Sequence, residues 1–183
     1  ADGLGAQEIA RLTMEAALVA AHRHVFGVLL CFVLLPGPCG AVLYRMAAVI
    51  KTRWQGGNVA EHNDFSAFSR RVFGIIDWLP LRATASVFAI VGNFEDAVHC
   101  WRTQAAQWPD RDLGIVLASG AGALGVRLGM PLADGLEVSD AAELGVGDPP
   151  DVDFMQSAVG LVWRATVLWV LLLFLLELAS LVG

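Results

Sequence analysis

The sequence predicts an all-α integral membrane protein with three or four membrane segments. Of its 183 residues, 56% are hydrophobic and only 16% are charged, and the mean hydropathy is +0.61. Soluble domains are about 45–50% apolar and about 25% charged. The net charge of −6 and the pI near 5.1 argue against a nucleic-acid-binding protein. We therefore expect a lipid bilayer as one partner and no nucleic acid.

The first apolar stretch leaves two arrangements open. Residues 2–24 have a loosely periodic apolar face that predicts a helix, and residues 25–35 are entirely apolar. A P-G-P-C-G sequence then breaks the run at residues 36–40, and an apolar segment resumes at 41–50. Two broken half-helices fit this pattern. One continuous span beginning near Ala17, followed by a second beginning near Gly40, fits it as well.

Residues 72–92 are apolar over about the length of a membrane span, yet Asp77, Pro80 and Arg82 lie at their centre. A charge within a span costs roughly 2.5 to 3.5 kcal/mol on insertion scales. We therefore expect Asp77 and Arg82 to face a protein interior or an aqueous cavity and to pair with each other. The segment either crosses the bilayer once or is re-entrant and broken at Pro80.

The second half of the chain contains four segments of different character. Residues 93–112 are amphipathic with helical spacing, and residues 113–132 are rich in Gly and Ala. Residues 133–153 are acidic and carry Gly and Pro, which predicts a flexible, solvated loop. Residues 154–182 follow, and their apolar core at 165–176 is the clearest transmembrane helix, bounded by Arg164 and Glu177.

Three groups of polar or small residues are candidate site features. Gly125 and Gly129 have the G-x-x-x-G spacing of closely packed helices, and Arg127 between them could reach a phosphate or extend to the interface. Asn93, Glu95 and the adjacent Asp96 could bind a divalent metal, but a solvated helix N-terminus explains them more simply. His22 and His24 are two residues apart and do not share a helix face, so charge at a helix C-terminus accounts for them and no metal site is expected.

Two motifs resemble the CobD/CbiB membrane proteins of cobalamin assembly. The run D-W-L-P-L-R-A-T-A at residues 77–85 is similar to that family's D-hydrophobic-x-P-x-R-L-T/A signature. The run A-S-G-A-G-A-L-G-V-R-L-G-M-P at residues 118–131 is similar to its A-G-A-L-G-V-R-L-G-G-P segment. Order and separation also agree. The resemblance implies one domain over residues 1–183, forming the C-terminal two-thirds of a longer chain.

The resemblance implies an enzyme of the bacterial inner membrane. Family members use ATP to join adenosylcobyric acid to an aminopropanol or its phosphate through an amide. If this chain is enzymatic, a corrinoid substrate, ATP and magnesium are implied. Asp77 and Arg82 would then organise catalysis, while Gly125, Arg127, Gly129, Asn93 and Glu95 would contact substrate. Homo-oligomerisation is left open.

Departures from that pattern leave catalysis uncertain. Family enzymes carry N-x-x-D-G where this chain has A-H-R-H-V at residues 21–25, and N-T-x-D-S-M where it has R-M-A-A-V-I-K-T at residues 45–52. AmpE-type inner-membrane proteins, which are proposed sensors, resemble it in the D-W-x-P-x-R motif and in the G-x-x-E of residues 92–95. The alternative is therefore a non-catalytic AmpE-like regulator with an eroded active site.

Overall fold

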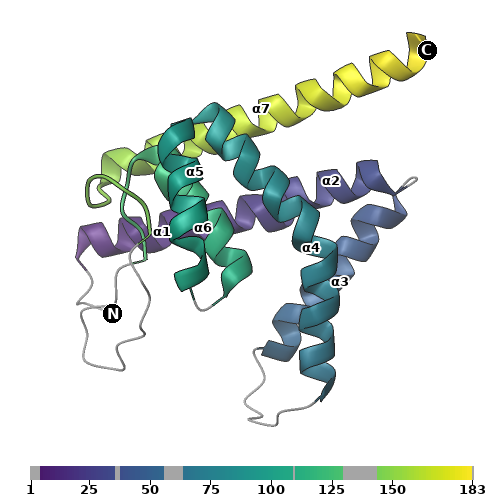
Figure 1. Cartoon of the computed structure of the whole chain (residues 1–183), viewed down its shortest axis with the longest axis horizontal. Helices are drawn as coiled ribbons and strands as arrows, with labels where there is room; N and C mark the ends of the chain where they lie inside the picture. The colour runs from purple at the N-terminus through teal and green to yellow at the C-terminus, as the bar shows by residue number, and fades with distance from the viewer. Residues whose placement is uncertain (1–4, 36–37, 56–63, 109, 130–143, 183) are drawn as a thin grey trace.

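The computed structural model describes residues 5–35, 38–55, 64–108, 110–129 and 144–182. Over these residues the fold is all-α, as predicted, and its β structure consists of two isolated bridges. Among the described residues, three helices are long and apolar enough to cross a bilayer, which is consistent with a multi-pass membrane protein: Gln7–Leu34, Arg71–Val91 and Asp153–Leu181. Figure 1 shows the arrangement of the helices.

The first span is one continuous helical segment and not two half-helices. It consists of α1 (Ala6–Ala21), a π-helical turn η1 (His22–Phe26) and α2 (Gly27–Leu34). The amide of Gly27 donates to the carbonyl of His22, five residues earlier, which closes the π turn. The inner face of the segment contributes large side chains to the core, among them Met14, Leu18 and Phe26.

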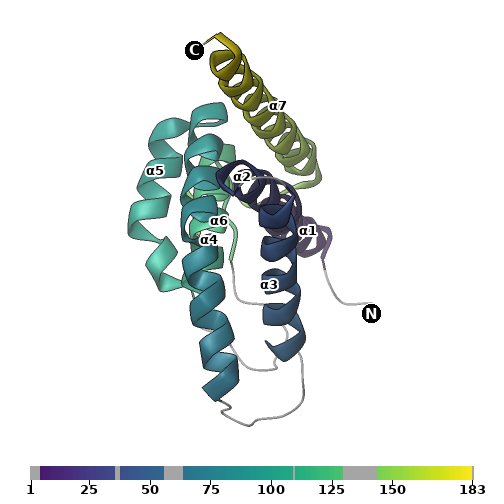
Figure 2. The same cartoon turned by 90° about the vertical axis from the view of Figure 1, so that its right-hand side faces the viewer.

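After a reversal of the chain, α3 (Cys39–Gln55) packs against α2 and then against α4. The reversal depends on Gly40, because a Cβ at this position would overlap the carbonyl oxygen of Cys31. Tyr44, Ala48 and Phe73 form a small second core between these helices, next to Cys31. Figure 2 shows α3 and α4 side by side.

The helix α4 (Asp64–Val91) runs through Pro80 without ending, so the re-entrant alternative is wrong. Proline removes one backbone hydrogen bond and crowds the preceding turn, which bends a helix without necessarily terminating it. Figure 1 shows α4 changing direction along its length. One face of α4 is buried and carries Phe73, Leu81, Ala85 and Phe88. The α4 side chains on this face are the ones that reach the protein interior.

The short helices α5 (Phe94–Thr103) and η2 (Ala105–Gln107) and the buried helix α6 (Arg111–Leu124) complete the compact part of the fold. The helices α5 and α6 approach closely because Gly122 has no side chain: a Cβ there would lie 2.5 Å from the Asp96 carbonyl oxygen. The predicted amphipathic helix at 93–112 is therefore confirmed for its first half and is interrupted at Gln104.

The last helix, α7 (Val152–Val182), packs on α1 through its first half, and its second half extends beyond the other helices (Figure 1). Large apolar side chains such as Phe174 and Leu181 are exposed there, as expected for a helix surrounded by lipid. The predicted acidic loop at 133–153 lies outside the described residues up to 143. The described part of this loop begins at Leu144, which is buried and exchanges backbone hydrogen bonds with Leu128. This part of the loop therefore packs against the segment that follows α6.

We predict that Gly40→Ala lowers the melting temperature of the purified protein in detergent. The new methyl group would meet a backbone carbonyl, which cannot rotate away as a side chain can, and overpacking of this kind costs about 1–3 kcal/mol. Gly160→Ala in α7 is the matched control, because a Cβ there meets no atom within 4 Å. Equal melting temperatures for the two variants would contradict the close contact between α2 and α3.

Candidate functional site

Asp77 lies at the centre of a buried polar network. The hydroxyl of Tyr44 donates to Oδ1 of Asp77 at 2.8 Å, and Nε2 of His22 lies 3.1 Å from the same oxygen. On the other side of the imidazole ring, Nδ1 of His22 lies 2.9 Å from the hydroxyl of Thr84. All four residues are at most 3% exposed. The network joins the first span, α3 and α4, and each side chain in it has at least one partner.

The backbone explains why these side chains meet. Asp77 and Thr84 are seven residues apart, so they lie on the same face of α4 within about 20°. The π turn places His22 opposite this face, and π turns occur frequently at functional sites. Tyr44 reaches Asp77 across α2 because Gly27 is next to it, and a Cβ at Gly27 would overlap the Tyr44 hydroxyl. The network therefore depends on three helices packing in one register.

The predicted ion pair between Asp77 and Arg82 is wrong. Side chains five residues apart on a helix point about 140° away from each other. Arg82 instead lies over the indole ring of Trp78 at 4.1 Å and donates to the Trp78 carbonyl at 3.0 Å. It belongs to the half-exposed face of α4. The partner of Asp77 is His22, which is 55 residues earlier in the chain.

Sequence reasoning missed His22, Tyr44 and Thr84 as members of the site. His22 was attributed to a helix end, but the helix continues through it, so that interpretation is wrong. One signal was available in the sequence. His22 lies just before an apolar stretch, and the Asp77 carboxylate needed a hydrogen-bond partner from another segment of the chain. His24 is exposed and receives a hydrogen bond from Arg45, so the two histidines have separate roles.

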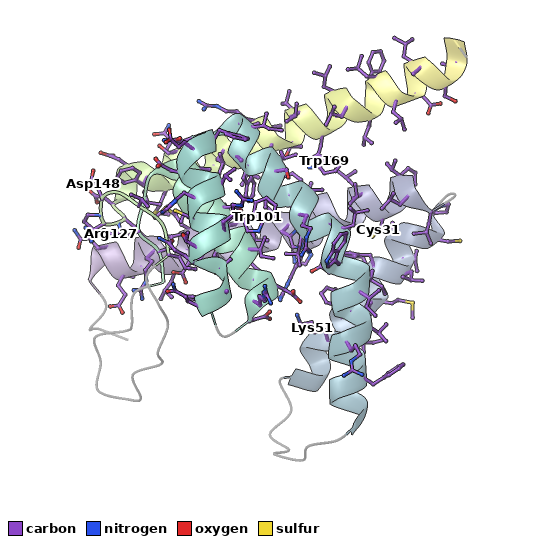
Figure 3. All side chains as sticks on the ribbon, viewed as in Figure 1. Cys31, Lys51, Trp101, Arg127, Asp148 and Trp169 are labelled. Carbon is purple, nitrogen blue, oxygen red and sulfur yellow. The ribbon has the colours of Figure 1, made fainter. Side chains whose placement is uncertain are left out.

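A second group of charges lies beside the network. Nζ of Lys51 is 3.4 Å from Oδ2 of Asp110 and lies 5.0 Å from the centre of the Phe73 ring. Lys51 is buried, and Figure 3 shows it at the lower end of the α3–α4 pair. Burial of the Asp112 carboxyl, and then the charge of Asp110, raise the pKa of Asp112, while Lys51 partly opposes them. Asp77 and Arg82 also act on this carboxyl, so both charge groups belong to one region.

Gly125, Arg127 and Gly129 lie elsewhere and do not form a helix-packing motif, so that expectation is wrong. Gly125 ends α6 in the left-handed conformation at φ 68°, and Gly129 also has a positive φ of 78°. The Gly129 amide donates to Glu15 at 2.8 Å. The Arg127 amide donates to the Asp148 carbonyl, and its buried Nε has no hydrogen-bond partner within the described residues.

Asn93 and Glu95 lie at the start of α5, beside the end of α6, because the Asn93 amide donates to the Ala123 carbonyl at 3.1 Å. The Asn93 side chain caps this helix by accepting from the Asp96 amide, and Glu95 is exposed in its first turn. The helix-terminus interpretation accounts for both residues. Asp77 is about 24 Å away along α4. Asp77 and Arg82 are therefore separated from the other five predicted site residues, and Figure 3 shows Arg127 distant from Lys51.

The described residues offer no ready site for Mg²⁺. They contain no group of three or more His, Cys, Asp or Glu side chains placed to hold a metal ion. Asp77, the obvious carboxylate, directs its oxygens to His22 and Tyr44. No chemical step through a bound metal follows from this arrangement.

Comparison with known proteins assigns the family. The family described as CobD/Cbib protein matches residues 1–162. The chain belongs to the CobD/CbiB family. A CobD/CbiB relative from Stutzerimonas stutzeri, named Cobalamin biosynthesis protein CobD, is 34% identical over 170 residues, which cover 93% of this chain and 55% of the relative. A protein of the same name from Chromobacterium violaceum is 36% identical over 161 residues, covering 88% and 51%.

The chain thus spans about half the length of the curated relatives it matches. A third relative with the same name, from Mycobacterium tuberculosis, is 38% identical over 91 residues, covering 45% of this chain and 29% of the relative. No solved structure matches the chain. These findings favour the resemblance to CobD/CbiB over the AmpE-like alternative.

We predict that Tyr44→Phe destabilises this CobD/CbiB protein by about 1–3 kcal/mol, because it removes a hydroxyl donor and leaves a buried carboxylate oxygen short of a partner. Chemical or thermal denaturation in detergent measures the change. Phe73→Leu, in the same small core but outside the network, controls for altered packing. Unchanged stability of Tyr44→Phe would show that the Tyr44–Asp77 hydrogen bond contributes little.

We predict that Asp112→Asn stabilises the protein at neutral pH. Because folding raises the pKa of Asp112 above its ordinary value of 3.8, the folded state holds this proton more tightly than the unfolded state does. The wild type therefore loses stability as the pH rises from 3.8 through the raised pKa, and the amide variant does not. The difference in melting temperature should be positive at pH 7 and vanish near pH 3.8.

Glu95→Gln, on the exposed first turn of α5, is the control for removing one negative charge. An Asp112→Asn protein that is less stable than the wild type at every pH would contradict the raised pKa. It would indicate instead that the carboxylate is stabilised by its surroundings.

Proposed function

We propose that the chain acts in cobalamin biosynthesis, as part of an inner-membrane enzyme that joins adenosylcobyric acid to an aminopropanol or its phosphate. Family membership and the relatives named Cobalamin biosynthesis protein CobD support this assignment. The three candidate spans are consistent with a membrane-embedded enzyme. A corrinoid is the proposed substrate.

The two segments that depart from the family pattern contribute the side chains that contact Asp77, and this observation carries the proposal. Asp77 comes from the D-W-L-P-L-R motif that the chain keeps. His22 lies within residues 21–25, which replace the family's N-x-x-D-G, and Tyr44 directly precedes residues 45–52, which replace its N-T-x-D-S-M. Both side chains bond to Asp77. Three segments far apart in the sequence thus converge on one carboxylate, as expected of an active centre whose polar residues have been exchanged together.

The charges around this carboxylate suit amide formation from an amine. The amine must lose a proton before it attacks an activated carboxyl group, and a carboxylate with a raised pKa accepts protons closer to neutral pH. Asp112 is such a group, and we assign it this role. Arg82 and Lys51 lie within electrostatic reach of Asp112 and would balance the negative charge of the corrinoid carboxylate. ATP would supply the activation of that carboxyl group.

Asp77 is a positioning residue in this scheme. It is buried and acts on the substrate only through its neighbours. The Asp77 carboxyl accepts a hydrogen bond from Nε2 of His22 when that nitrogen carries the ring proton, and it thereby fixes the orientation of the ring. Arg127, with its unpartnered buried Nε, remains a proposed anion contact near Gly125 and Gly129, and Asn93 and Glu95 remain proposed substrate contacts at the start of α5.

The test is complementation. We expect the full-length protein, expressed in a bacterium lacking its own synthase, to restore cobalamin-dependent growth on cobyric acid, with the amide product detected by mass spectrometry. Asp77→Asn should sharply reduce product formation without eliminating it, and Arg82→Gln should reduce it by about 10-fold or more, the usual effect of losing one charged contact. Arg102→Gln, an exposed change on α5, should leave it unchanged.

Membrane accumulation and melting temperature are measured for each variant, so that loss of folding is separated from loss of chemistry. For Asp77→Asn, the pH profile of product formation is also recorded, because a purely structural role would lower the rate equally at every pH. Absence of product from the wild type, when the folded protein is present in the membrane, would overturn the proposal.

A further inference from the structure

An open groove of about 580 Å³ lies between α3 and α4, the two helices that run side by side in Figure 2. Met46 in its wall is about 200° around α3 from Tyr44, so the groove faces away from the Asp77 network. None of the described side chains that line it carries a charge, an amide or a hydroxyl group. Its wall includes Cys39, Val42, Met46 and Ile50 from α3 and Val72 and Ile76 from α4.

The groove runs from the membrane surface toward the middle of the bilayer. The candidate span of α4 begins one residue before Val72, so this wall residue lies at the surface end. Lys51 lies 5.0 Å from the centre of the Phe73 ring, which places the neighbouring Ile50 at the same end. Cys39 lies about 16 Å further along α3. Because the hydrocarbon core of a bilayer is about 30 Å thick, this length corresponds to about one leaflet.

The exposed face of α3 indicates that lipid covers the groove. Val42 and Met46 are 56% and 59% exposed, although α3 is not among the three candidate spans. The polar sequence K-T-R-W-Q at residues 51–55 ends this helix. A helix with an apolar outer face and a basic polar end is typical of elements at the membrane surface. Hydrocarbon therefore surrounds the groove, and an occupant needs no hydrogen-bonding group within it.

Basic residues gather at the surface end of the groove. Arg71 is exposed there, at the first residue of the candidate α4 span. Arg53, near the end of α3, and Arg70 on α4 belong to the same end of the helix pair. Lys51 is buried and paired with Asp110, so its charge is partly compensated. Basic residues at the surface end of membrane helices attract negatively charged lipid head groups. The groove therefore combines an apolar channel with a cationic mouth.

We propose that this groove binds an anionic phospholipid, with one acyl chain along α3 and the phosphate at Arg71. Ala47 and Ile76 in the wall pack on the small core that contains Tyr44. An acyl chain in the groove presses on these two side chains and holds α3 against α4. It thereby keeps the Tyr44 hydroxyl within reach of Asp77. The lipid is a structural partner of the helix pair and not a reactant in amide formation.

Protection of Cys39 from alkylation reports occupancy of the groove, because this cysteine is exposed at its deep end while Cys31 and Cys100 are buried. The purified full-length protein in a neutral detergent is treated with N-ethylmaleimide during titration with phosphatidylglycerol or with phosphatidylcholine of the same acyl chains. Peptide mass spectrometry follows the modification of Cys39. We expect phosphatidylglycerol to protect Cys39 at an about 5-fold lower concentration, the ratio given by one cation beside an anionic head group.

Two variants separate the mouth of the groove from its channel. Arg71→Gln should remove the preference, so that both lipids protect Cys39 at the same concentration, whereas Arg102→Gln on the exposed face of α5 should keep it. Met46→Trp should fill the channel from its exposed side and remove the retained phosphatidylglycerol that native mass spectrometry detects on the wild type. Ile90→Trp, exposed on α4 outside the groove, is the matched control and should retain the lipid.

The proposal is overturned if the two lipids protect Cys39 of the wild type at the same concentration, or if Met46→Trp retains phosphatidylglycerol as the wild type does. Arg71→Gln remains decisive if Met46→Trp does not accumulate, because Arg71 is exposed and its replacement leaves the core unchanged. Amide formation does not enter either assay. The outcome is therefore independent of the complementation experiment, and each proposal can fail while the other stands.

Discussion

The fold depends on satisfying one carboxylate in the middle of a membrane helix. An unpaired charge at that depth is costly, and the cost falls only when hydrogen-bond donors from neighbouring helices are present. Tyr44 and His22 provide these donors to Asp77 from α3 and from the first span. Each donor requires its helix to sit at one height and one rotation relative to α4. The polar network therefore fixes the register of three helices that apolar packing alone would specify less sharply.

The two faces of α4 divide the remaining roles. One face carries Asp77 and Thr84 together with the apolar residues of the core, and it builds the structure. The other face carries Trp78 and Arg82, which are half-exposed and stack on each other. The charges of Lys51, Asp110 and Asp112 lie where these faces meet the start of α6. A rigid, satisfied network thus supports a more open group of charges that retains capacity for a ligand.

Much of this fold follows from patterns in the sequence, while the site follows from them only in part. The long apolar runs predict the three spans, because span length and composition are local properties. Helical geometry also implies that the side chains of Asp77 and Arg82 point in different directions. Their opposite charges instead favoured the expectation of an ion pair. The partnership of Asp77 with His22 is different, because it depends on a π turn that packing stabilises and no local preference predicts. The glycines at 125 and 129 show the converse problem, since a spacing compatible with helix packing occurs here at a helix cap and at a loop residue, both with positive φ.

The π turn at His22–Phe26 has a further consequence for the first span. It holds one more residue than an α-helical turn would, so the halves of the span before and after it are out of phase by about 100°. The first half thus directs its buried side chains toward α6 and α7, and the second half directs its own toward α3 and α4. One continuous helical segment thereby packs against two separate pairs of helices through two faces of different orientation. The single π turn therefore allows the first span to connect α3 and α4 with α6 and α7.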